Sequence, residues 1–183
     1  ISRLYTDREG YIWVCSATNG VYRIHAATGK IALNVNTSGR EGATLLANAT
    51  ADIIQYNDSL VAIAANGLNI LNLRTGKTKH HNTNSGFPSN EIANFSVDSK
   101  GYLWMSSGVG IISHHPIRGN TSTYSAMDGV HTKNFSTASV NPLRDGRIAI
   151  GTNHDMLLFD PIQITVEDYV PPKIEISGIS LMN

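Results

Sequence analysis

The chain repeats one unit, a glycine-containing turn followed by a short strand with an aromatic core, at intervals of about 45 residues. Two copies, Asp7–Ser16 and Asp98–Ser107, share the pattern Asp-x-x-Gly-Tyr-x-Trp, and a thinner copy spans Arg144–Thr152. Gly10 and Gly101 are 91 residues apart and Gly101 and Gly146 are 45 apart, so one further copy is expected near residue 57. Such a repeat restricts the chain to architectures built from stacked, similar units.

A second marker has nearly the same period. Asn19–Gly20 returns as Asn66–Gly67, and Thr28–Gly29 returns as Thr75–Gly76, each 47 residues later. Asn-Gly supplies the positive φ of a tight hairpin turn, and Thr-Gly offers the same freedom at the next turn. A period of about 40–50 residues with several short strands per unit is typical of a β-propeller blade.

The sequence therefore predicts an all-β fold of four four-stranded antiparallel blades in a partial ring. The propeller part is expected over residues 1–168, with blades at about 1–36, 49–82, 91–125 and 136–168, the last strand covering 162–167. No helical period of 3.6 is sustained for the 10–12 residues that a helix needs. Residues 169–183 are expected to form a linker at Pro171–Pro172 and the first strand of another domain. The chain opens mid-pattern at Ile1, so we expect it to be a segment of a longer protein.

Strands such as 148–150 and 60–63 are apolar on both faces, so each sheet needs a neighbour on each side. Trp13 and Trp104 fall at the same place in their copies and are expected to pack between adjacent blades. Ala149 stands at this place in the fourth copy, where a different packing is expected. The residues expected to build the repeat are Gly10, Trp13, Gly20, Gly29, Gly67, Gly76, Gly101, Trp104 and Gly146.

The charge balance argues against several classes of partner. The chain has 14 basic and 14 acidic residues and no basic run, so nucleic acid is not an expected partner. No apolar run approaches the roughly 18 residues of a membrane span, so no direct membrane contact is expected. The lone Cys15 cannot form an internal disulfide and is expected to be buried as a small apolar residue.

No catalytic residue, metal site or cofactor is predicted. His80–His81 and His114–His115 are adjacent pairs on strands, where neighbouring side chains point to opposite faces and cannot easily chelate one ion. Asp7, Asp98 and Asp145 lie in the repeated turn, where aspartate commonly caps backbone N–H groups.

A ligand, if there is one, is expected where connections from one blade to the next gather near the axis. These connections are 37–49, 83–91 and 126–136. Arginine, lysine and planar amides suit sugar hydroxyls or carboxylates. The predicted ligand-binding residues are Arg40, Glu41, Phe87, Asn90, His131, Lys133 and Asn134.

Taken together, the chain resembles the two-component regulator propeller repeats of Bacteroidetes hybrid histidine kinases. The resemblance rests on Asp7, Gly10, Ile12–Val14 and their counterparts around Trp104, and on the segment Gly86–Ile92. The fourth copy is similar to the last blade of such a propeller, which in the family leads into an immunoglobulin-like "triple tyrosine" domain. Pro171–Ile176 fits the entry strand of that domain.

The resemblance implies the periplasmic, non-enzymatic sensing part of an inner-membrane receptor that responds to glycan fragments. A ligand-linked shift in blade or dimer packing would pass through 170–181 to a transmembrane helix. The alternatives are a propeller enzyme of the streptogramin-lyase or lactonase kind and a structural protein-interaction scaffold. Because four blades rarely close alone, self-association through exposed blade edges is expected.

Overall fold

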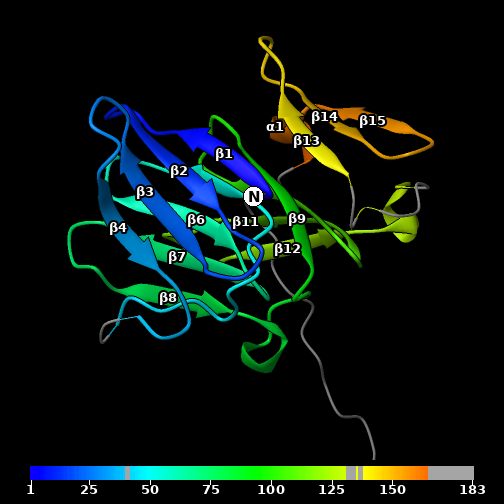
Figure 1. The fold of residues 1–183 in the computed structure, drawn as a ribbon. Coiled ribbons are helices and arrows are strands. Elements are labelled where there is room, and N and C mark those ends of the chain that lie inside the picture. Colours follow the sequence, from blue (N-terminus) through cyan, green and yellow to red (C-terminus); the bar gives the residue numbers. More distant parts are fainter. Residues whose placement is uncertain (40–41, 131–134, 136–137, 165–183) are drawn as a thin grey trace, which may run out of the picture.

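Four antiparallel sheets form the protein, and they are arranged as propeller blades (Figure 1). The structure is a computed structural model that describes residues 1–39, 42–130, 135 and 138–164. Blade 1 consists of β1 (Arg3–Thr6), β2 (Tyr11–Cys15), β3 (Val21–His25) and β4 (Ile31–Val35). Blade 2 consists of β5 (Ile53–Gln55), β6 (Leu60–Ala64), β7 (Leu68–Asn72) and β8 (Thr78–His81). Blade 3 consists of β9 (Ile92–Val97), β10 (Leu103–Ser107), β11 (Gly110–His114) and β12 (Thr121–Tyr124). Blade 4 consists of β13 (Ser139–Pro142), β14 (Ile148–Gly151) and β15 (Met156–Phe159).

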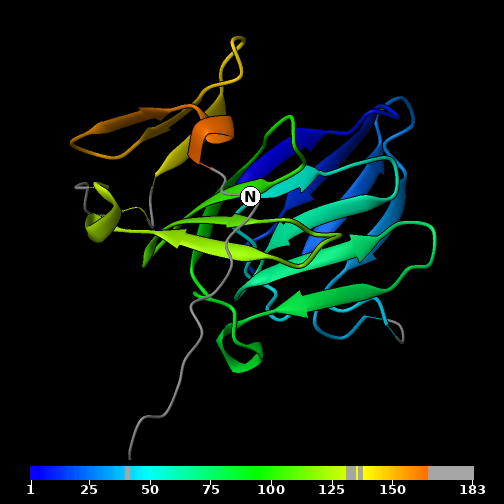
Figure 2. The ribbon, with the colours of Figure 1, turned by 180° about the vertical axis from the view of Figure 1, so that it is seen from behind.

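Within each blade, consecutive strands pair in order as a meander, so the first strand lies at one edge. These first strands, β1, β5, β9 and β13, contact one another in turn and form the inner edge of the arc. Figures 1 and 2 show the blue, cyan and green sheets side by side, with the orange sheet of blade 4 following β9. The predicted all-β fold with four antiparallel sheets in a propeller arrangement is confirmed.

The end of blade 4 differs from the prediction. Residues 162–164 belong to a short helix, α1 (Pro161–Ile164), so the predicted strand over 162–167 is wrong there, and 165–167 lie outside the described residues. Asp160 explains the helical turn, because its carboxylate accepts the N–H of Ile162 at 3.0 Å and proline occupies the first helical position. The described part of blade 4 therefore has three strands. The predicted linker and sandwich strand at 169–183 also lie outside the described residues.

A carboxylate in the turn explains the repeated Asp-x-x-Gly-x-x-Trp pattern. In blade 1 the Asp7 carboxylate accepts the backbone N–H of Glu9 and Tyr11 and the indole N–H of Trp13, the last at 3.0 Å. In blade 3, Asp98 does the same for Lys100, Tyr102 and Trp104, with the indole bond at 2.7 Å. The aspartate thus closes its turn and orients the ring that follows, as predicted for its capping role.

Blades 2 and 4 lack both members of this pair. The same turn hydrogen bond that starts at Asp7 N starts at Tyr56 N in blade 2 and at Leu143 N in blade 4. The cross-strand register places Ala62 and Ala149 where Trp13 stands. An indole N–H without its carboxylate would be a buried orphan donor, so the two positions are expected to change together.

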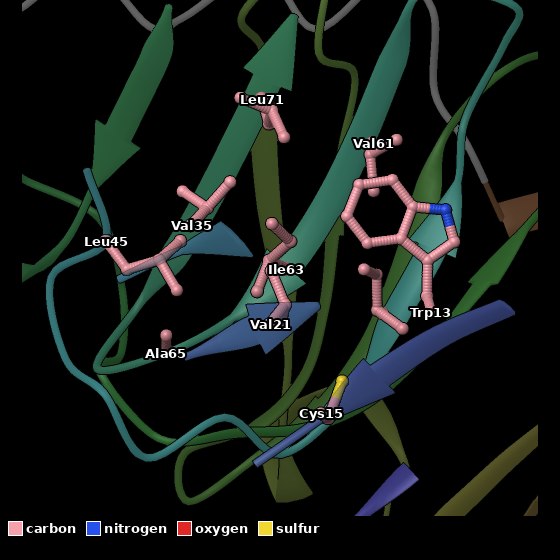
Figure 3. Close-up of a cluster of buried hydrophobic side chains, with 10 residues drawn as sticks. Trp13, Cys15, Val21, Val35, Leu45, Val61, Ile63, Ala65 and Leu71 are labelled. Carbon is pink, nitrogen blue, oxygen red and sulfur yellow. The ribbon is translucent and has the colours of Figure 1, made fainter. Parts of the chain in front are cut away.

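Three apolar clusters lie between successive blades. Trp13 and Cys15 of blade 1 pack with Val61 and Ile63 of blade 2 (Figure 3). Ala62 and Ala64 on the other face of β6 pack against blade 3, whose contacting side chains include Phe95, Leu103, Met105 and Ile112. Trp104 packs against Val140, Ile148 and Ile150 of blade 4. Blades 2 and 3 therefore bury both faces of their second strands, β6 and β10, as the sequence predicts.

The expected burial of Cys15 is confirmed. Cys15 is fully buried, and burial raises the pKa of its thiol to about 12, so it packs as a small apolar residue. None of the described residues forms a helix long and apolar enough to cross a membrane.

Candidate ligand-binding face

One end of the arc collects the blade-to-blade connections. Because strands alternate in direction, the connections that leave β4 and β8 begin at the same end as the turns between the second and third strands of each blade. We call this end the connection face. Between blades 2 and 3 it contains a hollow of about 320 Å³, within the size range of small-molecule sites. The hollow is lined by Ala49, Ala51, Ala64, Asn66, Asn90, Glu91 and Ile92.

Asn66 is held at the rim by an unusual backbone conformation. It is the only non-glycine residue with positive φ, 49°, in the part of the chain described. The tight turn is closed by a hydrogen bond from Ala65 N to Gly67 O at 3.0 Å. Gly67 has φ 118°, and a Cβ there would lie 2.4 Å from the carbonyl oxygen of His81, so no other residue fits. The exposed Asn66 side chain therefore projects from a fixed turn.

Asn90 and Glu91 form the opposite rim, on the connection that enters β9. The Asn90 side-chain oxygen accepts the Thr83 N–H at 2.8 Å, which fixes the orientation of the amide. The Glu91 N–H donates to Ser89 Oγ at 3.0 Å, and the Glu91 carboxylate is exposed. A Cβ at Gly108 would lie 2.5 Å from Glu91 Oε2, so the carboxylate lies directly over this glycine.

Buried Asp52, next to Ala51 of the hollow, links three blades near their inner edge. Its Oδ2 accepts the Phe95 N–H of blade 3 at 2.8 Å, and its Oδ1 lies 3.1 Å from Arg3 Nε of blade 1. Burial raises the pKa of Asp52, against the opposing effect of the hydrogen bonds from the Phe95 and Ile53 amides and of the Arg3 charge. The start of β5, directly after Ala51, is thereby tied to both neighbouring blades.

Of the predicted ligand residues that the structure describes, Asn90 lines the hollow and Phe87 does not. Phe87 is buried between blades 2 and 3, only 6% exposed. The other predicted residues, Arg40, Glu41, His131, Lys133 and Asn134, lie outside the described residues.

Phe87 forms an aromatic group with two histidines from neighbouring blades, of which His114 is buried and His81 is half-buried. Its ring centroid lies 5.7 Å from that of His81 in β8 and 5.6 Å from that of His114 in β11, and the two imidazoles are 4.8 Å apart. His114 Nδ1 contacts Thr121 Oγ1 at 2.8 Å, whereas Nε2 of each histidine has no hydrogen-bond partner among the described residues. Burial, with smaller effects from His81, Lys79 and His115, lowers the pKa of His114 to about 4.

This histidine pair predicts an acid-sensitive contact between blades 2 and 3. The unfolded chain takes up protons on His114 below its ordinary pKa, about 6.5, while the folded chain resists protonation until about pH 4. The free energy of unfolding should therefore fall by about 3 kcal/mol as the pH drops from 6.5 to 4. Urea titrations at several pH values measure this fall, which His114→Leu should largely remove and exposed His154→Leu should keep. An unchanged acid dependence in His114→Leu would contradict the assignment.

His80 and His81 point to opposite faces, as expected for adjacent residues of a strand. His80 Nε2 contacts the Thr44 carbonyl at 2.8 Å, while His81 faces His114 in the next blade. Groups of three or more metal-ligating side chains do not occur in the described ranges.

A second hollow, of about 370 Å³, lies between blades 3 and 4. Its walls are mainly aromatic and aliphatic, including Trp104, Tyr124, Leu157 and Phe159. Its carboxylate, Asp128, already accepts the Ser125 N–H at 2.8 Å. The hollow between blades 2 and 3 therefore offers more polar groups for recognition.

Sequence reasoning missed Asn66 and Glu91. The prediction considered only blade-to-blade connections, but the alternation of strand direction also places the Asn66–Gly67 turn on the connection face. Glu91 lies inside the connection that was singled out, beside the predicted Asn90.

Comparisons with known proteins support the fold. The extracellular domain of a protein described as a hybrid two-component system from B. thetaiotaomicron has a TM-score of 0.68 at 20% identity, covering 88% of this chain and 20% of that one. The extracellular domain of a one-component system from the same organism has a TM-score of 0.72 at 15% identity, with 90% and 23% covered. A catalytically inactive virginiamycin B lyase from Staphylococcus aureus, solved with quinupristin, has a TM-score of 0.57 at 16% identity, with 86% and 54% covered.

The chain thus spans about a fifth of the length of the first two structures and about half of the lyase. No protein-family model matches the sequence. No curated protein matches it either.

Proposed function

We propose that this chain is an extracytoplasmic sensing segment of a two-component receptor and that the hollow between blades 2 and 3 binds an oligosaccharide. The observation that carries the sensing role is the similarity of 88–90% of the chain to extracellular domains of bacterial signalling proteins, at TM-scores of 0.68–0.72. The periplasm is the compartment that such a role requires. The glycan ligand is argued from the chemistry of the hollow.

The hollow combines the groups that a sugar needs. Amides of Asn66 and Asn90 can donate and accept hydrogen bonds, and the Glu91 carboxylate can accept them, which suits hydroxyl groups that do both. Three alanines and Ile92 give a small apolar lining for the C–H faces of a sugar ring. Because Glu91 is a carboxylate, neutral oligosaccharides are favoured over acidic ones.

Binding of neutral oligosaccharides tests this proposal. A glycan array identifies the ligand, and calorimetric titration then measures its affinity for wild type and for Asn66→Gly. Glycine keeps the positive φ of 49° without strain and removes only the side-chain amide. We expect Asn66→Gly to weaken binding about tenfold, the effect of one or two lost hydrogen bonds.

The matched control is Asn153→Gly, in the corresponding turn of blade 4, which should bind as wild type does. Absence of binding to every neutral glycan, or equal loss in both variants, would overturn the glycan assignment. Incubation with quinupristin or simple lactones addresses the enzyme alternative, because a cleaved product would show catalysis, which the sensing proposal does not include.

A further inference from the structure

The two end faces of the arc expose apolar side chains, and the outer face of blade 4 also exposes Ser139 and Asn141 of β13. On the outer face of blade 1, Leu4 and Ile31 are 59% and 60% exposed, and Ile12, Val14 and Tyr22 are half-buried. On the outer face of blade 4, Met156 and Leu158 are 72% and 40% exposed. We call these surfaces the start face and the end face.

The register of the sheets shows which internal surface each end face corresponds to. In blade 1, Ile12 and Val14 occupy the places of Leu103 and Met105 in blade 3. Leu103 and Met105 are fully buried against blade 2. The start face is therefore the equivalent of the surface with which blade 3 covers blade 2.

The end face corresponds to the other side of that same interface. In blade 4, Ala149 pairs with Leu158 and Gly151 pairs with Met156. In blade 2, Ala62 pairs with Ile70 and Ala64 with Leu68, and these four residues form the surface that packs on blade 3. Both surfaces have small residues on the second strand and large aliphatic residues on the third strand. They differ on the first strand, where blade 2 has Ile54 and blade 4 has Asn141.

Size complementarity selects the pairing of the two ends. Internal interfaces are of two kinds: a tryptophan on one blade packs on Val, Ile and Leu side chains of the next, or small residues pack on larger ones. The end face, with Ala149 and Gly151, has the small-residue side. The start face has the large-residue side, with Tyr22 where blade 3 has Ile112 and Leu4 where it has Phe95.

We propose that the end face of one copy of this chain packs on the start face of a second copy, reproducing the contact between blades 2 and 3. The contact is heterologous, so it joins copies head to tail and can close only if the rotation allows it.

Mixing of variants tests the head-to-tail geometry. Sedimentation of the 183-residue chain should show concentration-dependent association. Val14→Asp disables the start face and Leu158→Asp the end face, and each alone should weaken association at least tenfold. An equimolar mixture should regain dimers, because the intact end face of Val14→Asp meets the intact start face of Leu158→Asp.

The matched control is Ser122→Asp on the exposed edge strand β12, which should associate as wild type does. Circular dichroism and urea denaturation establish that both variants remain folded, as expected for surface positions. A wild-type chain that stays monomeric would overturn the proposal. So would a Leu158→Asp variant that still dimerises, which indicates start face on start face, or a mixture that stays monomeric. Oligosaccharide binding is a separate readout, so failure here leaves the sensing proposal standing.

Discussion

Replacing Trp104 with alanine is expected to lower the free energy of unfolding by about 3–5 kcal/mol, the usual cost of removing a buried aromatic side chain. The ring is 1% exposed and lies between blades 3 and 4. Its centroid is 5.5 Å from that of Tyr124, with which it stacks, and 5.0 Å from that of Phe159. Truncation would open a cavity in this cluster and leave Asp98 without its indole donor.

Urea denaturation measures the change. Met127→Ala provides the control, because this large side chain is 96% exposed and its loss should change stability by less than about 0.5 kcal/mol. A Trp104→Ala variant within about 1 kcal/mol of wild type would mean that the tryptophan is not packed between sheets.

Replacing Asp7 with alanine is expected to cost about 3–5 kcal/mol, because it breaks a buried ion pair from one side and orphans several donors. The Asp7 side chain is fully buried and lies 2.7 Å from Arg23 Nη2, and it also accepts the Trp13 indole N–H. Arg23 retains its contact with Glu9 at the surface. Urea denaturation again measures the loss, and Asp58→Ala, at an exposed ion pair with Arg8, should cost less than about 1 kcal/mol.

The charge of Asp7 also gives this prediction a pH dependence. Burial alone would raise the pKa of Asp7, but hydrogen bonds from Arg23, Tyr11 and Trp13 outweigh it and hold the pKa below its ordinary value. Its stabilisation is therefore present above about pH 4 and is lost as the pH falls towards the lower folded-state pKa. In Asp7→Asn, the free energy of unfolding should fall less as the pH drops below about 4. Equal acid dependence in both proteins would contradict the role assigned to the carboxylate.

The blades were predictable because their repeat is local. Turn residues and strand patterns specify each meander. The strands predicted at 92–97 and 110–114, for example, follow from residues that are close in sequence. The prediction of a last strand in blade 4 was wrong over 162–164. The sequence pattern there resembles that of the other copies, but Asp160 and Pro161 favour a helical turn. Alternation alone does not reveal a cap that competes with it.

The candidate site was less predictable because it depends on long-range contacts. Phe87 looked like a loop residue available to a ligand, but packing with His81 and His114 buries it. Asn66 reaches the site because the turn of one blade lies next to the connection that enters the following blade. Asp52 joins three blades, which no spacing within a single repeat indicates.

The exchange rates of the two indole N–H groups test the account most directly, because the chain has two tryptophans and nitrogen-15 NMR can follow each one. Both N–H groups donate to aspartate in the space between neighbouring sheets. We expect both to exchange with solvent only on global unfolding, and the Trp104 signal alone to lose protection in Asp98→Ala. Rapid exchange of both indoles in the wild-type chain would contradict the packing of tryptophan-bearing sheets against one another.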